Sequence, residues 1–203
     1  MAPMHRDPLL FRQLIGALWL AWLLYWVVSA LRSKPTARRE SPGSRLASVI
    51  PMVIGGLLIG WHHASWGWLG TRLWPRSLTA AWIGVAVLTA GLLFAVWARV
   101  HLGRNWSGVV TVKEGHELIR SGPYAYVRHP IYTGLIAAVL GTAIASGTLR
   151  AAVGFVVISA SLVMKLRREE LFMRQTFPGE YERYSAQVPA LIPFTSPPQS
   201  APR

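Results

Sequence analysis

Five long apolar segments dominate this chain of 203 residues and leave few folds open to it. Their apolar cores lie at about residues 9–31, 46–61, 78–98, 131–149 and 151–166. A helix of about 20 apolar residues crosses the hydrocarbon core of a bilayer, and backbone polar groups in lipid are satisfied only within helices or closed barrels. The sequence therefore predicts an all-α integral membrane protein with about five transmembrane helices. The last helix is expected to continue to about residue 175.

The basic residues are distributed unevenly among the connections between these segments. The chain carries 21 Lys and Arg residues against 8 Asp and Glu, a formal net charge of +13. Sixteen of the 21 fall in the first connection, the third connection and the C-terminal region, which five crossings place on one side of the membrane. Because Lys and Arg concentrate on the cytoplasmic side, the N-terminus is predicted to be outside and the C-terminus cytoplasmic. A lipid bilayer, rather than nucleic acid, is therefore the expected partner of this charge.

Three regions are expected along the chain. Residues 1–98 hold the first three membrane helices, residues 99–194 hold a catalytic region with the last two, and residues 195–203 form a disordered tail rich in Pro and Ser. Gly56 and Gly60 form a Gly-x-x-x-Gly pair, which predicts close helix packing within the chain rather than a dimer interface. The chain has no Cys, and no set of His and carboxylate residues shows metal-ligand spacing, so no metal site is predicted.

A charged and aromatic stretch, SGPYAYVRHPIYTG at residues 121–134, stands immediately before the fourth apolar segment. Pro130 suits the first position of a helix, where its missing N–H costs nothing, and His129 is expected to be the N-cap. The free N–H groups of the first turn, together with Arg128 and His129, would suit a carboxylate or phosphate. Taken alone, this segment is equally consistent with an anion-binding site and with a simple anchor that holds the helix end at the lipid headgroups.

A second polar cluster, LRREELF, ends the fifth apolar segment. The fourth and fifth segments are expected to form a helical hairpin with its turn near residues 146–150. Its arms, roughly 24 and 30 Å long, return to the same membrane face. Four side chains are therefore predicted to converge in one cytoplasmic pocket: Arg128, His129, Tyr132 and Glu170. Carboxylates at a hydrocarbon boundary are costly unless paired or functional, and Glu170 is the one expected to be functional, whereas Glu169 has Lys165 one turn earlier as a partner.

The segments GPYAYVRHPIYTG, EEL and FPGEYERYSAQVPALIPF follow one another at a recognisable spacing. In this order they resemble the isoprenylcysteine carboxyl methyltransferase family of membrane enzymes, whose general pattern the phospholipid N-methyltransferases share. The resemblance covers about residues 99–194. It implies an enzyme that binds S-adenosylmethionine between its last helices and its cytoplasmic loops and methylates a lipophilic acceptor. A glycine-rich motif of the Rossmann type is absent from the sequence.

The resemblance also implies roles for individual residues. The cofactor-binding positions that it implies are His116, Glu117, Leu118, Ile119, Tyr124, His129, Pro130, Ile131, Tyr132 and Glu170. Arg128 and Glu170 are the expected catalytic residues. A basic residue about one turn before the Glu contacts substrate in the family, which points to Arg167 or Lys165. These roles agree with the chemistry of the cofactor, since its carboxylate needs a cation or a helix N-terminus and its ammonium needs an acceptor such as Glu170.

Two other classes of protein remain as alternatives. NADPH-dependent membrane reductases of the sterol type resemble the same C-terminal pattern, although the paired Glu residues and the VPALIPF ending favour methyl transfer. A non-catalytic membrane scaffold or metal-tolerance protein would leave the converging polar residues unexplained. The acceptor is open between an isoprenylcysteine-type carboxylate and a lipid amine, thiol or acid, and it is expected to arrive from the bilayer. The host membrane is open between a bacterial inner membrane and the endoplasmic reticulum, and the oligomeric state is open as well.

Overall fold

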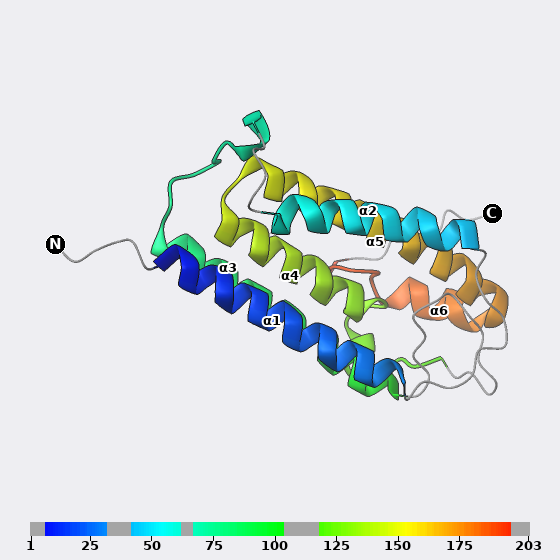
Figure 1. Cartoon of the computed structure of the whole chain (residues 1–203). Coiled ribbons are helices and arrows are strands. Elements are labelled where there is room, and N and C mark those ends of the chain that lie inside the picture. Colours follow the sequence, from blue (N-terminus) through cyan, green and yellow to red (C-terminus); the bar gives the residue numbers. More distant parts are fainter. Residues whose placement is uncertain (1–6, 32–41, 62–66, 104–117, 196–203) are drawn as a thin grey trace.

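The computed structural model describes residues 7–31, 42–61, 67–103 and 118–195 (Figure 1). Within these ranges the chain is mainly helical and contains no extended strand, apart from one isolated bridge between Arg72 and Thr148. The α-helices are α1 (Asp7–Ala30), α2 (Pro42–Gly60), α3 (Leu78–Leu102), α4 (Pro130–Ser146), α5 (Leu149–Thr176) and α6 (Glu180–Gln187). Two short 3-10 helices, η1 (Gly67–Gly70) and η3 (Gly122–Ala125), lie in the connections. The five expected long helices are thus all present, and their bounds lie within a few residues of the predicted ones.

The apolar helices differ in length. The segment of α1 from Leu9, together with α3 and α5, is long and apolar enough to cross a membrane, whereas the apolar part of α2 and all of α4 are shorter. At 1.5 Å per residue the 17 residues of α4 span about 25 Å, somewhat less than the hydrocarbon core. The all-α membrane architecture is therefore supported by three candidate spans. Five crossings and their direction stay predictions.

The α4–α5 hairpin turns where the sequence predicted it. Gly147 ends α4 in the left-handed conformation with φ 61°, and its N–H donates to the carbonyl of Ala143. A side chain at Gly147 would also meet the indole nitrogen of Trp74, 2.7 Å from a Cβ. Because α4 and α5 run back alongside each other from this turn, the start of α4 and the end of α5 lie at the same end of the bundle (Figure 1).

Glycines bring the backbones of α3 and α4 into direct contact. A Cβ on Gly91 would lie 2.5 Å from the carbonyl oxygen of Gly134, and a Cβ on Gly84 would lie 2.5 Å from that of Gly141. Helices in membranes pack through such small residues, since lipid tails provide no hydrophobic force to press larger side chains together. Leu88 and Leu92 of α3 complete this contact, and both are buried.

The α2–α5 contact uses a glycine other than those expected. Gly55 packs against α5, where a Cβ would lie 2.9 Å from the carbonyl oxygen of Gly154. The predicted Gly56–Gly60 pair is wrong as a packing motif, because a Cβ at either position would meet nothing within 4 Å. The contact face of α2 is therefore rotated by one residue relative to the one that the Gly-x-x-x-Gly pattern indicated.

Substituting Gly91 tests the α3–α4 contact. Gly91→Ala is expected to destabilise the protein by about 1–3 kcal/mol, because the added methyl group forces two backbones apart. Gly16→Ala in α1, where a Cβ meets nothing within 4 Å, is the matched control and should be neutral or slightly stabilising. Thermal unfolding of purified protein in detergent measures both. Equal melting temperatures for the two variants would contradict this packing.

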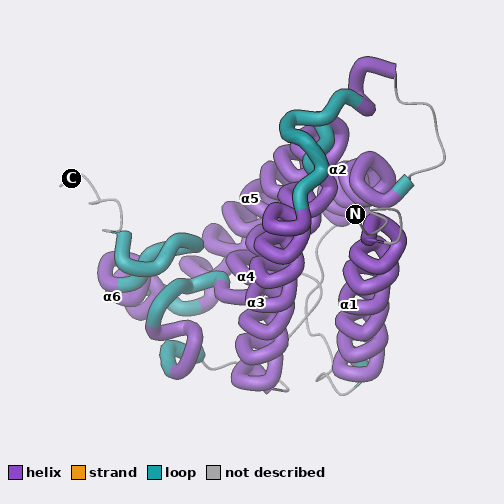
Figure 2. Tube along the Cα trace, turned by 90° about the vertical axis from the view of Figure 1, so that its left-hand side faces the viewer, coloured by secondary structure: helices purple, strands orange, loops and turns teal. Residues whose placement is uncertain are grey.

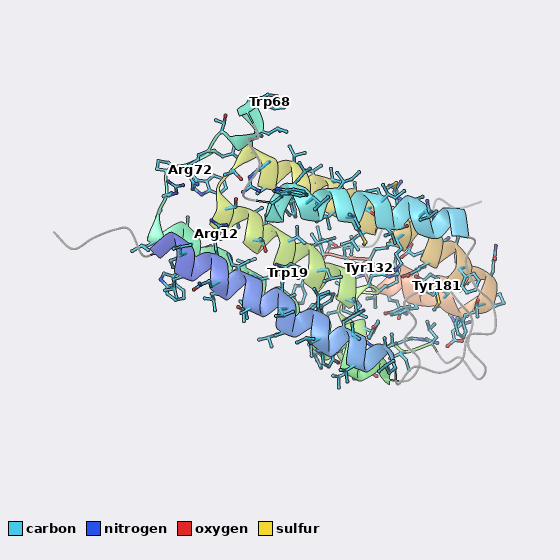
Figure 3. All side chains as sticks on the ribbon, viewed as in Figure 1. Arg12, Trp19, Trp68, Arg72, Tyr132 and Tyr181 are labelled. Carbon is cyan, nitrogen blue, oxygen red and sulfur yellow. The ribbon has the colours of Figure 1, made fainter. Side chains whose placement is uncertain are left out.

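The predicted site residues lie at one end of the helical bundle, next to α6. Helix α6 lies on the far side of α3 and α4 from α1 (Figure 2). Tyr132 and Tyr181 are at the end near α6, and Arg12 and Arg72 are at the opposite end (Figure 3). The predicted site residues therefore gather where α4 begins and α5 ends.

Candidate active site

Arg128 sits directly before α4 and uses all three guanidinium nitrogens on protein groups. Nε donates to Oε1 of Glu170 over 2.9 Å, and Nη2 donates to the same oxygen. Nη1 donates to the backbone carbonyls of Ser185, over 3.1 Å, and Val188. The side chain of Arg128 is only 5% exposed and that of Glu170 16%. The predicted meeting of Arg128 and Glu170 is confirmed, and Arg128 joins α5, α6 and the segment after α6 around one carboxylate.

His129 and Tyr132 form a second layer against the two Glu residues. Their rings are parallel, with centroids 5.7 Å apart and planes 5° apart. The Tyr132 hydroxyl donates to Oε1 of Glu169 over 2.5 Å. Nε2 of His129 lies 3.4 Å from Oε1 of Glu170, and Nδ1 lies 3.7 Å from Oε2 of Glu169. The four side chains predicted to converge do so, and Glu169, which was not among the predicted site residues, joins them.

The two basic residues considered as substrate contacts differ in their placement. The Lys165 ammonium stands over the Tyr132 ring, 5.7 Å from its centroid. Arg167 is exposed on α5. Lys165 and Glu169 are four residues apart and so share one face of the helix, whereas Arg167 lies on another face. A substrate role for either residue stays a prediction, with Lys165 the one beside the aromatic pair.

The segment after α6 is bound to the start of α4 by backbone hydrogen bonds. The Arg128 N–H donates to the carbonyl of Pro189 over 2.9 Å, and the His129 N–H donates to that of Ala190 over 3.0 Å. The Thr133 hydroxyl donates to the carbonyl of Leu191 over 2.7 Å. This segment is the start of the motif VPALIPF, which the sequence alone indicated only through the family resemblance. In the structure its first residues hold Arg128 and His129 in place.

A tyrosine from η3 packs behind this layer. The Tyr184 hydroxyl of α6 donates to the backbone carbonyl of Tyr124 over 2.6 Å, and the His101 ring of α3 stacks on the Tyr124 ring. His101 also lies within hydrogen-bonding distance of the Ser121 hydroxyl, at 2.9 Å. Gly122 has φ 59°, and a side chain there would collide with the His101 ring. Tyr124, expected to bind the cofactor, is thus a buried ring held by α3 and α6.

Burial keeps these tyrosines neutral. It raises the pKa of Tyr124 and Tyr184 well above the ordinary value for a phenol. The same holds for Tyr181, whose pKa is raised by burial first and by the charge of Glu170 second. All three hydroxyls therefore remain hydrogen-bond donors throughout the physiological pH range.

The other positions implied by the resemblance divide into two groups. Pro130 is buried at the first position of α4, with His129 as its N-cap as predicted, and Ile131, Leu118 and Ile119 are partly buried. His116 and Glu117 lie outside the described residues. Their roles stay predictions, as does the cofactor-binding role of the whole set. Within the described ranges no group of three or more His, Asp or Glu side chains is arranged to hold a metal ion.

The region that carries this site matches a known protein family. Isoprenylcysteine carboxyl methyltransferase (ICMT) family members match residues 82–175, which run from α3 to the end of α5. A cobalt-zinc-cadmium resistance protein, CzcN, from Cupriavidus metallidurans is 32% identical over 151 residues, 73% of this chain and 62% of that protein. A probable protein-S-isoprenylcysteine O-methyltransferase from Oryza sativa subsp. indica is 30% identical over 117 residues, 56% of this chain and 61% of that protein.

The relatives are longer than the region they share with this chain, which spans about three fifths of their length. Among solved structures, the eukaryotic intramembrane Ras methyltransferase ICMT is similar, with a TM-score of 0.48 and 26% identity over 78% of this chain and 55% of that one. The family match includes Arg128, His129, Tyr132 and both Glu residues of the site. Residues 82–175, which include these side chains, are therefore similar to the isoprenylcysteine carboxyl methyltransferase family.

Proposed function

We propose that this protein is an integral membrane methyltransferase that uses S-adenosylmethionine to methylate a lipophilic acceptor. The observation that carries the proposal is the cluster of Arg128, His129, Tyr132, Glu169 and Glu170, which lies inside the family region and at one end of the helical bundle. A helix anchor at the headgroups would need only exposed basic side chains. A buried Arg–Glu pair beside a His–Tyr–Glu set is instead costly to desolvate and points to binding or chemistry.

The side chains fit the polar end of S-adenosylmethionine. Glu169 and Glu170 offer carboxylate oxygens to its ammonium group, and the His129 and Tyr132 rings form a flat wall beside them. Tyr124 in η3 adds a third ring, which is buried. Bound there, the cofactor supplies a methyl group on a positively charged sulfur. The protein contributes position and exclusion of water, which are the main means of accelerating an in-line displacement.

The acceptor chemistry decides whether a base is required. A carboxylate or thiolate acceptor reacts without losing a proton, and the cluster then needs only to orient it. An amine or neutral thiol must lose a proton, and His129 or one of the Glu carboxylates in the cluster is placed to accept it. A lipophilic acceptor is favoured, because residues around the site end of the molecule expose large apolar side chains, among them Leu171, Ile192 and Phe194.

The proposed orientation has the N-terminus outside and the site facing the cytoplasm, in a bacterial inner membrane or the endoplasmic reticulum. It is supported by the uneven distribution of Lys and Arg. Because the chain has no Cys, single Cys labels test it directly. Glu182→Cys, at the site end, is expected to be protected from an impermeant maleimide in intact cells, and Arg76→Cys to be labelled. The reverse pattern would invert the topology.

Binding and turnover test the proposed activity. Purified protein in detergent is expected to bind labelled S-adenosylmethionine and not NADPH, and to transfer the methyl label to a component of a membrane lipid extract or to an isoprenylcysteine analogue. Binding of NADPH in place of S-adenosylmethionine would favour a reductase. Binding of neither would remove the cofactor assignment altogether.

A further inference from the structure

Four arginines gather at the end of the bundle opposite the candidate active site. They come from three parts of the chain: Arg12 from the second turn of α1, Arg72 and Arg76 from the segment between η1 and α3, and Arg150 from the start of α5. Figure 3 shows Arg12 and Arg72 at this end. Within each of the pairs Arg72–Arg76 and Arg12–Arg150, the positive charges are close enough to act on each other. Holding like charges together costs free energy unless an anion balances them.

The described carboxylates lie at the other end of the molecule. The Glu residues whose side chains are described belong to α5 and α6, at the site end: Glu169, Glu170, Glu180 and Glu182. The ion pairs that the described side chains form lie at that end as well. Among the described side chains, the arginine end therefore carries positive charge and no negative charge.

Arg72 is held over the turn between α4 and α5. Its backbone pairs with Thr148 in the isolated antiparallel bridge, and its Nε donates to the carbonyl of Trp74 over 3.1 Å. Nη2 lies 2.9 Å from the place that a Cβ on Gly147 would occupy. Neither Nη group donates to a described residue, so the outer part of this guanidinium is available to an anion.

The other three arginines differ in exposure. Arg12 and Arg76 are exposed and form no hydrogen bond or ion pair with a described residue. Arg150 is only 7% exposed, and its Nη1 donates to the carbonyls of Leu58, over 2.6 Å, and Ile59, over 2.8 Å, at the end of α2. Arg150 therefore adds charge while it holds α2 to α5, whereas the exposed arginines can donate to a ligand.

Aromatic residues indicate the depth of this end in the bilayer. Two candidate spans begin at Leu78 and Leu149, so Arg76 stands immediately outside the apolar segments. Trp68 of η1 is 72% exposed, and Trp82 in the second turn of α3 is 55% exposed. Exposed Trp side chains favour the headgroup level of a membrane. The arginines are therefore expected at the depth of the lipid phosphates, where a phospholipid is the most abundant anion.

We propose that Arg12, Arg72 and Arg76 bind the phosphate of an anionic phospholipid at the end of the molecule opposite the candidate active site. Guanidinium N–H groups donate to the phosphodiester oxygens, for which their planar geometry is suited. The acyl chains contact the exposed apolar side chains of α1 and α3. The bound lipid balances the repelling charges and joins α1 to the segment before α3. This inference does not depend on the proposed methyltransferase activity.

Removing charge from this end tests lipid binding. The probe is short-chain phosphatidylglycerol, titrated against protein in uncharged detergent and followed by native mass spectrometry. A basic residue beside an anionic lipid contributes roughly fivefold to the affinity, so Arg72→Gln/Arg76→Gln is expected to bind the lipid about thirtyfold more weakly. Arg76→Gln alone, which removes no contact to a described residue, should cost about fivefold.

The matched control for binding is Arg174→Gln/Arg183→Gln. It removes two exposed charges from the site end and so changes the net charge by the same amount. Its affinity for phosphatidylglycerol is expected to equal that of the wild type. Equal weakening in the two double variants would show general attraction between a basic protein and an anionic lipid, and would overturn the inference.

Thermal unfolding separates a lipid from a soluble anion. Phosphatidylglycerol in the micelles should raise the melting temperature of the wild type and not that of Arg72→Gln/Arg76→Gln, since a ligand stabilises only the protein that binds it. Phosphatidylcholine and inorganic phosphate should raise neither. Without lipid the double variant is expected to melt at or above the wild-type temperature, because two like charges are gone. Stabilisation by inorganic phosphate alone, or none by phosphatidylglycerol, overturns the lipid assignment.

Discussion

Replacing Arg128 with Met is expected to slow methyl transfer strongly and to destabilise the protein by about 3–5 kcal/mol, the usual cost of breaking a buried ion pair. The substitution leaves Glu170 without its main partner and frees the carbonyls of Ser185 and Val188. Because Arg128 connects three elements, the loss extends beyond one contact. Activity should fall by roughly a hundredfold or more, about 2.7 kcal/mol in the barrier.

Arg128→Lys distinguishes this role from a membrane anchor. A lysine reaches the headgroups as well as an arginine, so an anchor would tolerate the change. A lysine has no planar guanidinium, so it cannot donate to Glu170 and to two backbone carbonyls at once. Both the melting temperature and the rate of methyl transfer are therefore expected to lie between those of the wild type and Arg128→Met. Arg183, exposed on α6, is the control, and Arg183→Met should be nearly silent in both assays. If Arg128→Lys unfolds at the wild-type temperature and transfers methyl groups at the wild-type rate, Arg128 is only a membrane anchor.

The sequence predicted the elements of this site because their signals are local or follow from helix geometry. Pro130 marks the start of α4 and Gly147 lies in the turn between α4 and α5. The arm of α5 from this turn to Glu170 is comparable in length with α4, so the two arms return to one place. Arg128 and Glu170, 42 residues apart, were therefore predicted to meet from counting alone. The glycines that form helix contacts could not be predicted in this way. Neighbouring glycines such as Gly55 and Gly56 differ only in the helix face that they occupy, and the sequence does not indicate which face packs against α5.

The partners of each polar group could not be predicted in the same way. Nothing local in the sequence indicates that the carbonyls of Val188 and Pro189 bind Arg128, since backbone acceptors carry no residue signature. The sequence accordingly predicted a ligand for the Arg128 guanidinium, whereas all three of its nitrogens bind protein groups. Glu169 was likewise set aside in favour of a Lys165 pair, whereas the Tyr132 hydroxyl reaches it across 37 residues of chain. Long-range hydrogen bonds of this kind decide which side chains remain available to a ligand.

Glu170→Gln is expected to weaken S-adenosylhomocysteine binding by tenfold or more, and by a larger factor than Glu169→Gln. The ligand ammonium loses a charge-assisted hydrogen bond in both variants, worth about 1.5–3 kcal/mol. Glu170 is the carboxylate nearest to His129 Nε2 and is held by Arg128, whereas Glu169 accepts a hydrogen bond from the Tyr132 hydroxyl. Equal and small effects in a calorimetric titration would mean that the ammonium binds elsewhere.

The double variant Arg128→Met/Glu170→Gln separates binding from folding. Each single change leaves a buried charge without its partner, but the double change removes both charges, so much of the lost stability should return. Ligand affinity and methyl transfer should not return, because the acceptor for the ammonium is still missing. Melting temperature, titration and turnover on the four proteins of this cycle measure the two quantities independently. Recovery of activity together with stability would show that Glu170 only balances the charge of Arg128, and that the ligand is bound without it.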